Sequence, residues 1–330
     1  MRNLAIVGGG SWGTALAMVL SPRFARTRLW VFESDLAARM RTSRVNDLYL
    51  PGFLLPGAVQ ITSDLVEALE GADIVLSVVP SHLVRGIYSQ MRACLPSGAL
   101  LVSATKGLEN TTLLRMSQVI REVCGSDVRT AVISGPSFAR EVARGEPTAV
   151  VAASDYPDAA AAVQAAFSGP TLRVYTSIDP TGVEIGGSIK NVVAIGAGVL
   201  HGLGLGHNAM AALITRGLAE MTRLAVAMGG KPLTLAGLAG LGDLVLTCTG
   251  ELSRNRTVGV ELARGRRLEE ITGSMKMVAE GVKTTNAAVD LAAKYRVEMP
   301  IAEQMFQVLH NGTSPREAIQ RLMERSLKGE

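Results

Sequence analysis

The sequence is poor in aromatic residues and in cysteine, and both shortages exclude classes of protein. Only 4% of its 330 residues are Phe, Trp or Tyr, so the stacking platforms on which proteins bind single-stranded nucleic acid are not expected. Its cysteines are few and far apart: Cys94, Cys124 and Cys248. Such a sparse, odd set predicts neither a disulfide framework nor a zinc site and is typical of a reducing compartment. We therefore expect a cytoplasmic protein that holds no metal and binds no nucleic acid.

Charged residues are also few, and no stretch suggests a membrane span. Asp, Glu, Lys and Arg make up 19% of the sequence against 48% hydrophobic residues, a balance typical of a soluble, well-packed enzyme. The net charge of +4 is mild and its basic residues are scattered, which favours small anionic substrates over nucleic acid. We see no apolar run near the roughly 20 residues that cross a bilayer, and the N-terminal apolar segment is too short for a signal peptide. The sequence predicts no membrane insertion.

Glycine, by contrast, is abundant and is concentrated in one stretch. Residues 182–206 contain eight glycines, yet the apolar spacing from Val183 to Leu203 predicts a helix. Each glycine costs a helix roughly 1 kcal/mol relative to alanine. We therefore expect these glycines to permit the close approach of another helix or of a ligand.

The same stretch contains an isolated charge. Lys190 is the only Asp, Glu, Lys or Arg residue between Glu184 and Arg216. Apolar surroundings disfavour an ammonium ion, so the pKa of Lys190 should fall toward neutrality, as a general acid/base requires. The alternative is a lysine whose charged end reaches the surface from an ordinary core helix. On this stretch alone both interpretations stay open.

The N-terminus carries a dinucleotide-binding pattern. An apolar run at residues 4–7 predicts a buried strand, residues 14–20 have helical spacing, and GGGSWG lies between them. In this GxGxxG pattern Gly8 would make the tight turn, Gly10 would let the backbone approach a pyrophosphate, and Gly13 would pack helix against strand. Free N–H groups at the helix start would then hold the negative charge. A glycine turn without a ligand is the alternative.

An acidic residue follows the second predicted strand, residues 28–32. Glu33 stands there, twenty positions after Gly13. Such a residue usually accepts hydrogen bonds from the adenosine ribose 2′-hydroxyl and repels a 2′-phosphate. The sequence therefore favours NAD over NADP, and a glutamate that merely faces solvent is the alternative interpretation.

Polar residues and glycines also follow the later strands. Those strands are predicted at residues 74–79, 99–103 and 130–133. A Pro- and Gly-rich segment at residues 50–58, before them, is predicted to be a loop. Open α/β sheets bind ligands beyond the carboxyl ends of their strands. Lys106 could polarise a carbonyl or pair with a phosphate there, and an exposed loop lysine is the alternative. Gly135 and Ser137 could offer an N–H and a hydroxyl group to the same ligand, unless they only cap a helix.

Strand patterns nearly vanish after residue 180. Two last strands are predicted at residues 148–152 and 172–175, and amphipathic helical spacing dominates from there to the C-terminus. We therefore predict an α/β fold in two domains. A Rossmann-like, doubly wound, mostly parallel sheet would form a dinucleotide-binding domain at residues 1–180. An all-helical domain at residues 181–330 would follow, and it would be the substrate-binding and catalytic domain if Lys190 is an acid/base group.

Two polar features interrupt the helical half. Asp243 is the sole charge between Lys231 and Glu251, and a carboxylate in so apolar a segment needs a partner, for which Lys190 is the obvious candidate. Serine, arginine and asparagine then cluster at residues 253–256 before a predicted helix. Such a helix start can bind an anion, although a solvent-exposed cap is the simpler interpretation.

These segments resemble the bacterial NAD(P)-dependent glycerol-3-phosphate dehydrogenases over almost the whole chain. The segments that carry the resemblance are, in order, GGGSWGTALA, SATKGLE, SGPSFAREVARGEPTAVV, GVEIGGSIKNVVAIGAGVLHGLGLGHNAMAALITRGLAEM, GLAGLGDLVLTCTGELSRNR and VAEGVKTT. The resemblance implies reversible reduction of dihydroxyacetone phosphate to sn-glycerol 3-phosphate with NADH or NADPH, which supplies phospholipid synthesis. It also implies a homodimer.

The resemblance further implies roles for individual residues. Lys190 would be the catalytic acid/base, assisted by Asp243 and Lys106. The residues expected around the substrate are Lys106, Gly135, Ser137, Lys190, Asp243, Ser253, Arg254 and Asn255. Those expected around the cofactor, besides the three glycines and Glu33, are Ser11, Trp12, Lys106, Ala139, Arg254, Val278 and Glu280. Relatives often carry Arg or His where this chain has Val31-Phe32-Glu33, which departs from the usual use of NADPH.

Two other functions fit parts of the pattern. A 3-hydroxyacid or 6-phosphogluconate-type dehydrogenase could also combine glycine-rich helices with a catalytic lysine, and Arg254 could bind a carboxylate. A non-catalytic NAD-binding protein should have lost Lys190 or Asp243, and both are present. The sequence therefore favours an enzyme.

Overall fold

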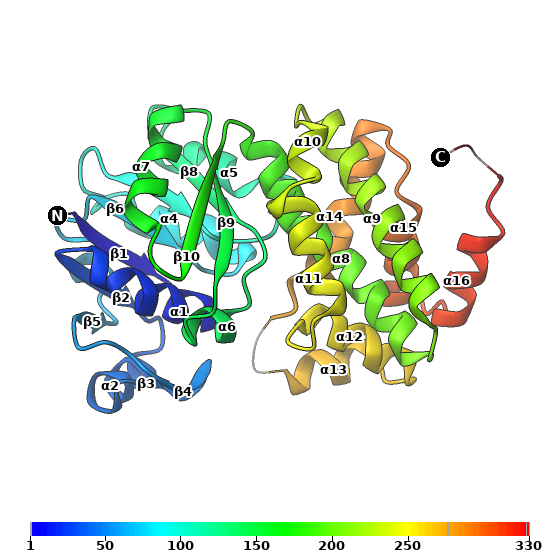
Figure 1. The fold of residues 1–330 in the computed structure, drawn as a ribbon, viewed down its shortest axis with the longest axis horizontal. Coiled ribbons are helices and arrows are strands. Elements are labelled where there is room, and N and C mark those ends of the chain that lie inside the picture. Colours follow the sequence, from blue (N-terminus) through cyan, green and yellow to red (C-terminus); the bar gives the residue numbers. More distant parts are fainter. Residues whose placement is uncertain (1, 276–277, 328, 330) are drawn as a thin grey trace.

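The computed structural model describes residues 2–275, 278–327 and 329, and it places a sheet-containing half beside a helical half (Figure 1). The strands of the sheet half are β1 Asn3–Val7, β2 Arg26–Trp30, β3 Val45–Asn46, β4 Leu50–Leu54, β5 Val59–Thr62, β6 Ile74–Ser77, β7 Leu100–Ser103, β8 Thr130–Ser134, β9 Thr148–Ala153 and β10 Leu172–Ser177. Its helices are α1 Ser11–Leu20, α2 Ser34–Ser43, α3 Leu65–Leu69, α4 Val84–Met91, α5 Met116–Cys124, α6 Ala139–Ala143 and α7 Pro157–Phe167, with short 3₁₀ turns at Ser21–Arg23 and Ser81–Leu83.

The helical half follows without a further strand among its described residues. Its helices are α8 Pro180–Gly202, α9 His207–Ala227, α10 Pro232–Leu235, α11 Asp243–Thr249, α12 Arg254–Ala263, α13 Leu268–Ser274, α14 Glu280–Tyr295, α15 Pro300–His310 and α16 Pro315–Met323, with a π-helical turn at Leu238–Gly242. The predicted fold class, a mostly parallel sheet followed by helices, is confirmed.

The main sheet brings the ends of its central strands to one edge. Its strand order is β10-β9-β8-β7-β6-β1-β2-β5, and its pairs are parallel except for β8 with β9. Val7 lies opposite both Trp30 and Ser77, and Ser77 lies opposite Ser103, so four strands end at the same level. Two of them, β6 and β7, are short, mostly apolar runs buried on both faces, as parallel strands covered by helices usually are. The loops that follow the four strands therefore meet at one edge.

Residues 50–58 correct the predicted loop. Leu50–Leu54 forms β4, which pairs with β3 in a separate antiparallel ribbon. Pro51 and Gly52 obscured it, because both usually interrupt strands, but an exposed two-stranded ribbon tolerates them. The second strand of the main sheet also begins and ends two residues earlier than predicted, at Arg26 and Trp30.

Helix α8 lies at the centre of the helical half and is buried along almost its whole length. Its glycines bring it against α12. A Cβ atom on Gly198 would lie 2.0 Å from the carbonyl oxygen of Arg256, and one on Gly259 would lie 1.9 Å from that of Ile195. The two helices are thus in backbone contact, which confirms that the glycines of α8 permit close approach of another helix.

Two segments are longer and more apolar than the sequence prediction allowed. Residues Pro180–Gly202 and Pro232–Thr249 both meet the length and composition expected of a membrane-crossing helix. The prediction that no such run exists was therefore wrong. The 18-residue apolar window of the first segment, α8, is 100% buried inside the protein, so its apolar character is that of a core helix, which is hydrophobic on every side.

Candidate active site

The glycine loop after β1 has the shape that the GxGxxG pattern predicts. Gly8 has a φ of +124°, and a Cβ atom there would lie 2.5 Å from the carbonyl oxygen of Val78. A Cβ atom on Gly13 would lie 1.9 Å from the carbonyl oxygen of Gly8, so loop and helix touch there. No atom lies within 4 Å of a Cβ atom on Gly10, and α1 begins at the next residue without a side-chain cap. This open helix start fits a dinucleotide pyrophosphate, which needs N–H donors and close backbone approach.

Glu33 lies where α2 begins, just beyond the end of β2. Its carboxylate accepts a hydrogen bond of 2.6 Å from the hydroxyl of Tyr49. Burial and this neighbouring carboxylate raise the pKa of Tyr49 to about 12, so the phenol stays a donor at neutral pH. Tyr49 is itself placed by Asn46, whose side-chain oxygen accepts from the N–H of Tyr49, and whose amide group donates to the carbonyl of Gly9. The carboxylate of Glu33 is therefore held in place beside the glycine loop.

A cluster of three charges joins the two halves. The ammonium group of Lys106, on the loop after β7, lies 2.7 Å from Oδ2 of Asp243, and that of Lys190 lies 3.3 Å from Oδ1. Lys106 also donates to the carbonyl oxygen of Gly135 at 2.8 Å and to the hydroxyl of Ser137 at 3.3 Å. The predicted pairing of Asp243 with Lys190 is confirmed, and the structure adds Lys106 to it.

Burial dominates the electrostatics of Lys190. Only 6% of this residue is exposed, and the loss of hydration lowers its pKa to about 8. Lys106 repels the ammonium ion and lowers the pKa further, while Asp243 attracts it and opposes both effects. The lysine therefore does not reach the surface, and the snorkelling alternative is excluded. At neutral pH it is mostly protonated but close enough to its pKa to exchange a proton.

The start of α12 is more closed than the sequence suggested. The hydroxyl of Ser253 accepts from the N–H of Arg256 and lies 3.1 Å from the hydroxyl of Thr247. Ser253 and Asn255 are both buried, whereas Arg254, the first residue of the helix, is exposed. Two of the three side chains predicted to bind an anion thus already have protein partners. Arg254 alone is exposed as a residue, although protein atoms around its guanidinium group lower the pKa of that group and Glu280 opposes this effect.

Asn255 connects α12 with two other helices. Its amide group donates to the side-chain oxygen of Asn191 at 2.9 Å, and its own oxygen accepts from the N–H of Gly281 at 2.9 Å. The same oxygen of Asn191 also accepts from Lys190 at 3.1 Å. Sequence reasoning missed Asn191 because nothing in the spacing shows that it lies between the lysine and Asn255. Its position directly after Lys190, in an otherwise apolar helix, was the available signal.

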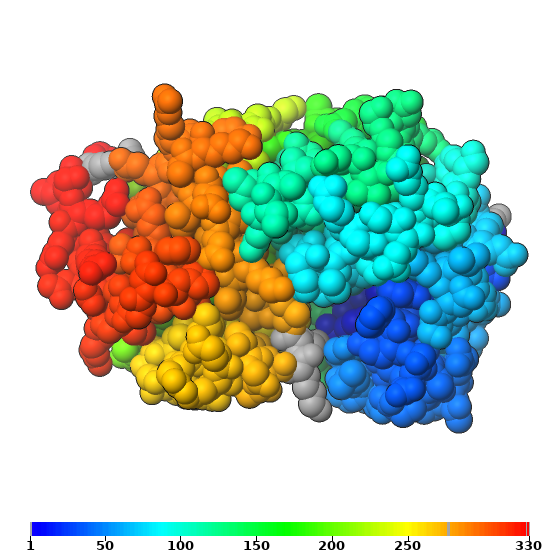
Figure 2. Space-filling view, turned by 180° about the vertical axis from the view of Figure 1, so that it is seen from behind, coloured from blue at the N-terminus to red at the C-terminus, as the bar shows by residue number. Residues whose placement is uncertain are grey.

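The other predicted cofactor residues lie around the glycine loop and between the halves. Trp12 and Ala139 pack against the same small buried cluster, so α1 and α6 are neighbours. Glu280, the first residue of α14, accepts hydrogen bonds from the hydroxyl and the N–H of Ser81 at 2.7 and 3.3 Å. Val278 is partly exposed near the start of that helix. The view from behind shows the orange surface of the helical half against the cyan surface of the sheet half (Figure 2).

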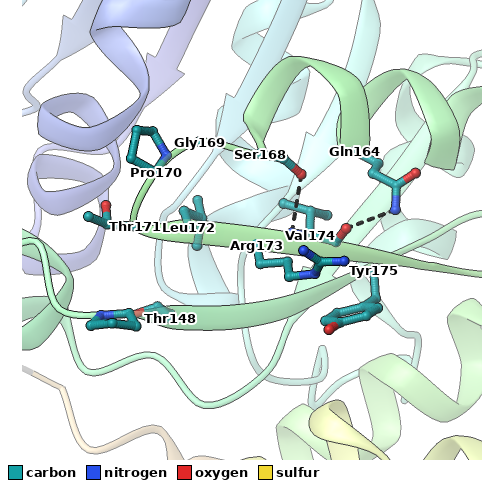
Figure 3. Close-up of a pocket in the computed structure, with 11 residues that line it drawn as sticks. Thr148, Gln164, Ser168, Gly169, Pro170, Thr171, Leu172, Arg173, Val174 and Tyr175 are labelled. Carbon is teal, nitrogen blue, oxygen red and sulfur yellow. Dashed lines mark hydrogen bonds between the residues drawn. The ribbon is translucent and has the colours of Figure 1, made fainter.

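A pocket lies elsewhere, along the edge strand β10. It has a volume of about 520 Å³ and contains none of the predicted site residues. Side chains satisfy the outward-facing backbone groups of Val174 in β10: Ser168 accepts from its N–H, and Gln164 donates to its carbonyl oxygen (Figure 3). Nothing in this pocket resembles the charge cluster. Among the described residues, no group of His, Cys, Asp and Glu side chains could hold a metal ion.

Comparison with known proteins points to one family. The family model for the N-terminus of NAD-dependent glycerol-3-phosphate dehydrogenase matches residues 3–160, and the model for its C-terminus matches residues 179–320. The glycerol-3-phosphate dehydrogenase [NAD(P)+] of Koribacter versatilis is 56% identical over 98% of each chain. The enzyme of the same name from Geobacter sulfurreducens is 53% identical over 100% of this chain and 99% of its own.

A solved structure agrees with these relatives. The crystal structure of glycerol-3-phosphate dehydrogenase from Coxiella burnetii superimposes with a TM-score of 0.94 at 42% identity, over 98% of this chain and 99% of that one. The match covers both the sheet half and the helical half, and so includes the residues of the charge cluster. This chain belongs to the NAD-dependent glycerol-3-phosphate dehydrogenase family.

Proposed function

We propose that this protein reversibly reduces dihydroxyacetone phosphate to sn-glycerol 3-phosphate with a nicotinamide dinucleotide. The observation that carries the proposal is the cluster of Lys106, Asp243 and Lys190, which stands where the sheet edge meets the helical half. A buried lysine of lowered pKa, held by a carboxylate, is what proton transfer to a developing alkoxide requires. Family membership supplies the substrate class.

The cofactor would lie along the sheet edge, which falls within our proposed dinucleotide-binding domain, residues 1–180. Gly8, Gly10 and Gly13 would shape its pyrophosphate site, and the N–H groups of Ser11 and Trp12 would bind the phosphate oxygens. When bound, its reduced nicotinamide supplies a hydride to the ketone carbon of the substrate. Other residues proposed to contact it are Lys106, Ala139, Arg254, Val278 and Glu280.

Lys190 would donate a proton to the substrate. As the ketone is reduced, negative charge grows on its oxygen, and the buried ammonium group of Lys190 would stabilise that charge and then protonate it. Asp243 would hold the ammonium group in place through the 3.3 Å contact. Lys106 would fix the other carboxylate oxygen, so that Asp243 cannot turn away from Lys190. In the reverse direction neutral Lys190 would accept the proton.

The substrate phosphate would bind at the start of α12, in the proposed substrate domain, residues 181–330. Arg254 is exposed there and can donate two hydrogen bonds to a phosphate. Ser253 and Asn255 would contribute mainly by shaping the helix start, because their side chains are already engaged. Gly135 and Ser137 would complete the site from the sheet half. Binding energy from the phosphate would then position the carbonyl for reaction.

We also propose that the enzyme prefers NADH. Glu33 is held beside the glycine loop by Tyr49, where its charge would repel a 2′-phosphate and its oxygens would accept from a ribose 2′-hydroxyl.

The decisive experiment measures oxidation of NADH and of NADPH by the purified protein with dihydroxyacetone phosphate. Turnover mainly with NADH is expected. Turnover mainly with NADPH would support the reaction and refute the role of Glu33. If neither is oxidised by protein that binds cofactor, the proposed substrate is wrong, and a 3-hydroxyacid or 6-phosphogluconate becomes the next substrate to assay.

We further propose a cytoplasmic homodimer that supplies phospholipid synthesis without inserting into membranes. The sparse, free cysteines support the cytoplasm, and the burial of the apolar window of α8 supports the absence of membrane insertion. Light scattering after size-exclusion chromatography should give twice the chain mass of 34.7 kDa. A mass of one chain would contradict the dimer.

A further inference from the structure

Helix α8 contains one carboxylate, on Glu184, and one lysine ammonium group, on Lys190, and they point to different parts of the molecule. Lys190 contacts Asp243 in the charge cluster. Glu184 is also buried, with 4% of its side chain exposed, and contacts the start of α5 in the sheet half. The six-residue separation places the two groups about 9 Å apart along the helix axis.

The carboxylate of Glu184 is fully engaged by α5. It accepts from the guanidinium of Arg115 at 2.5 Å, from the hydroxyl of Ser117 at 2.6 Å and from the N–H of Ser117 at 2.8 Å. Arg115 is the N-cap residue of α5. The carboxylate thus satisfies a free N–H group at a helix start and pairs with the cation beside it, both of which favour a negative charge.

The segment between Glu184 and Lys190 has no room to move sideways. A Cβ atom on Gly186 would lie 2.5 Å from the carbonyl oxygen of Ala239, and one on Gly187 would lie 2.5 Å from the hydroxyl of Ser134 at the end of β8. Two glycines therefore seat α8 directly between the sheet edge and the π-helical turn that precedes Asp243. Small residues allow this fit but make no directional bond, so they do not fix where along its axis the helix rests.

We propose that Glu184 is a positioning residue: its bonds to Arg115 and Ser117 fix α8 against the sheet, and thereby fix Lys190 relative to Asp243 and Lys106. The geometry requires an anchoring contact between the two halves. Lys106 comes from the sheet half and Lys190 from the helical half, and both ammonium groups must reach the carboxylate of Asp243. The buried helix between them is rigid enough to transmit a displacement from one end to the other. The inference rests on the proposed function, since its readout is turnover.

The test compares Glu184→Gln with a matched control on the same helix. Asp179 is also buried, and its carboxylate accepts from the N–H groups of Gly182 and Lys231, both outside the sheet half. Asp179→Asn therefore weakens the start of α8 without releasing the helix from the sheet. All variants are assayed below their unfolding transitions, checked by circular dichroism.

We expect Glu184→Gln to lower kcat about tenfold, because small misplacements of catalytic groups are costly. It should also move the basic limb of the pH–rate profile by about half a unit, since the pKa of Lys190 depends on its distance from Asp243. The dissociation constant for NADH should stay within about twofold, because the glycine loop is untouched. Asp179→Asn should keep the wild-type kcat and pH profile despite a lower melting temperature.

Equal kcat and equal pH profiles for the two variants would overturn the inference. If Glu184→Gln does not fold, Arg115→Lys and Ser117→Ala replace it, and each should lower kcat and move the pH profile in the same direction. If neither Arg115→Lys nor Ser117→Ala lowers kcat and moves the pH profile, the inference is again overturned. Failure of the proposed function is distinguishable, because the wild-type protein would then show no turnover.

Discussion

The sheet half contributes a glycine loop with open space for a ligand, besides the side chain of Lys106, whereas the helical half contributes several buried charged and amide side chains. The glycine loop offers N–H groups and empty space around Gly10. Helices α8, α11 and α12 offer Lys190, Asp243 and Asn255, each less than a tenth exposed. Backbone groups bind an anion without needing a particular side chain, whereas proton transfer needs a titratable group in a controlled environment. We therefore expect cofactor binding to depend mainly on the sheet half and proton transfer to depend mainly on the helical half.

The sharpest way to test this separation is to remove the ammonium group. Lys190→Ala should lower kcat by about 10² to 10⁴, the usual contribution of general acid catalysis. The dissociation constant for NADH, measured by fluorescence titration, should be unchanged, because the glycine loop lies in the other half. Loss of NADH binding together with turnover would break the comparison.

The glycine loop can be tested with a pair of alanines. Gly13→Ala would place a Cβ atom 1.9 Å from the carbonyl oxygen of Gly8, so it should weaken NADH binding and destabilise the fold by about 1 to 3 kcal/mol. Gly10→Ala meets open space and has a φ of −69°, which any residue adopts. It should keep the melting temperature and weaken only NADH binding. If Gly10→Ala binds NADH normally, the pyrophosphate does not occupy that space.

The pH dependence of ketone reduction should report the buried lysine. Because the protonated form of Lys190 donates the proton and its pKa is about 8, the rate should be constant below pH 8. Above pH 8 it should fall about tenfold per unit. The profile of kcat/KM for dihydroxyacetone phosphate, at saturating NADH, measures this. A profile that stays flat to pH 10 would assign proton donation to another group.

Glu220 offers a contrast to Asp243, because it is buried in the helical half and forms no salt bridge with a cation among the described residues, although Arg223 attracts it from a distance. It accepts from the N–H groups of Ile301 and Ala302 at the start of α15, yet burial raises its pKa from 4.5 to about 7. Between these two values the folded protein holds a proton that the unfolded chain has lost, so the free energy of unfolding should fall as the pH rises. The fall should be at most roughly 3 kcal/mol.

Urea unfolding of the wild type and of Glu220→Gln at pH 5 and pH 8 measures that effect. The variant should lack this part of the pH dependence, because an amide does not titrate in this range. The same pH dependence in both proteins would show that Glu220 ionises normally.

The smallest expected effect concerns Tyr49. Tyr49→Phe removes the hydrogen bond to Glu33 but leaves its charge, so the preference for NADH over NADPH should fall only about twofold to fivefold, the value of one weak hydrogen bond. Glu33→Gln removes the charge and should lower the preference more. The measurement is the ratio of kcat/KM with NADH to kcat/KM with NADPH for each variant. If this ratio is unchanged in both variants, Glu33 does not select the cofactor.

The sequence was most informative where one local feature, such as an apolar run or an isolated charge, determines the secondary structure or a charge partner. Apolar runs predicted the buried strands. The isolated charges of Lys190 and Asp243 predicted that the two residues form a pair, because burying an unpaired charge costs too much free energy. Spacing could not show that Lys106 reaches the same carboxylate from a loop 137 residues away. It also could not show that Asn255 faces Asn191 instead of solvent, since both orientations suit the start of a helix. Contacts between the halves depend on packing that no local pattern encodes.

The edge strand β10 limits how the protein can assemble. An exposed strand edge with free N–H and carbonyl groups can add a strand from a neighbouring molecule. Here Ser168 and Gln164 already bind the outward groups of Val174, and Gly169 donates to the carbonyl of Leu172. A second copy therefore cannot pair with β10 at Val174 or at the carbonyl of Leu172 without displacing these bonds. A copy that approaches this part of β10 would therefore meet side chains and the loop before the strand, whose composition can change without disturbing the sheet.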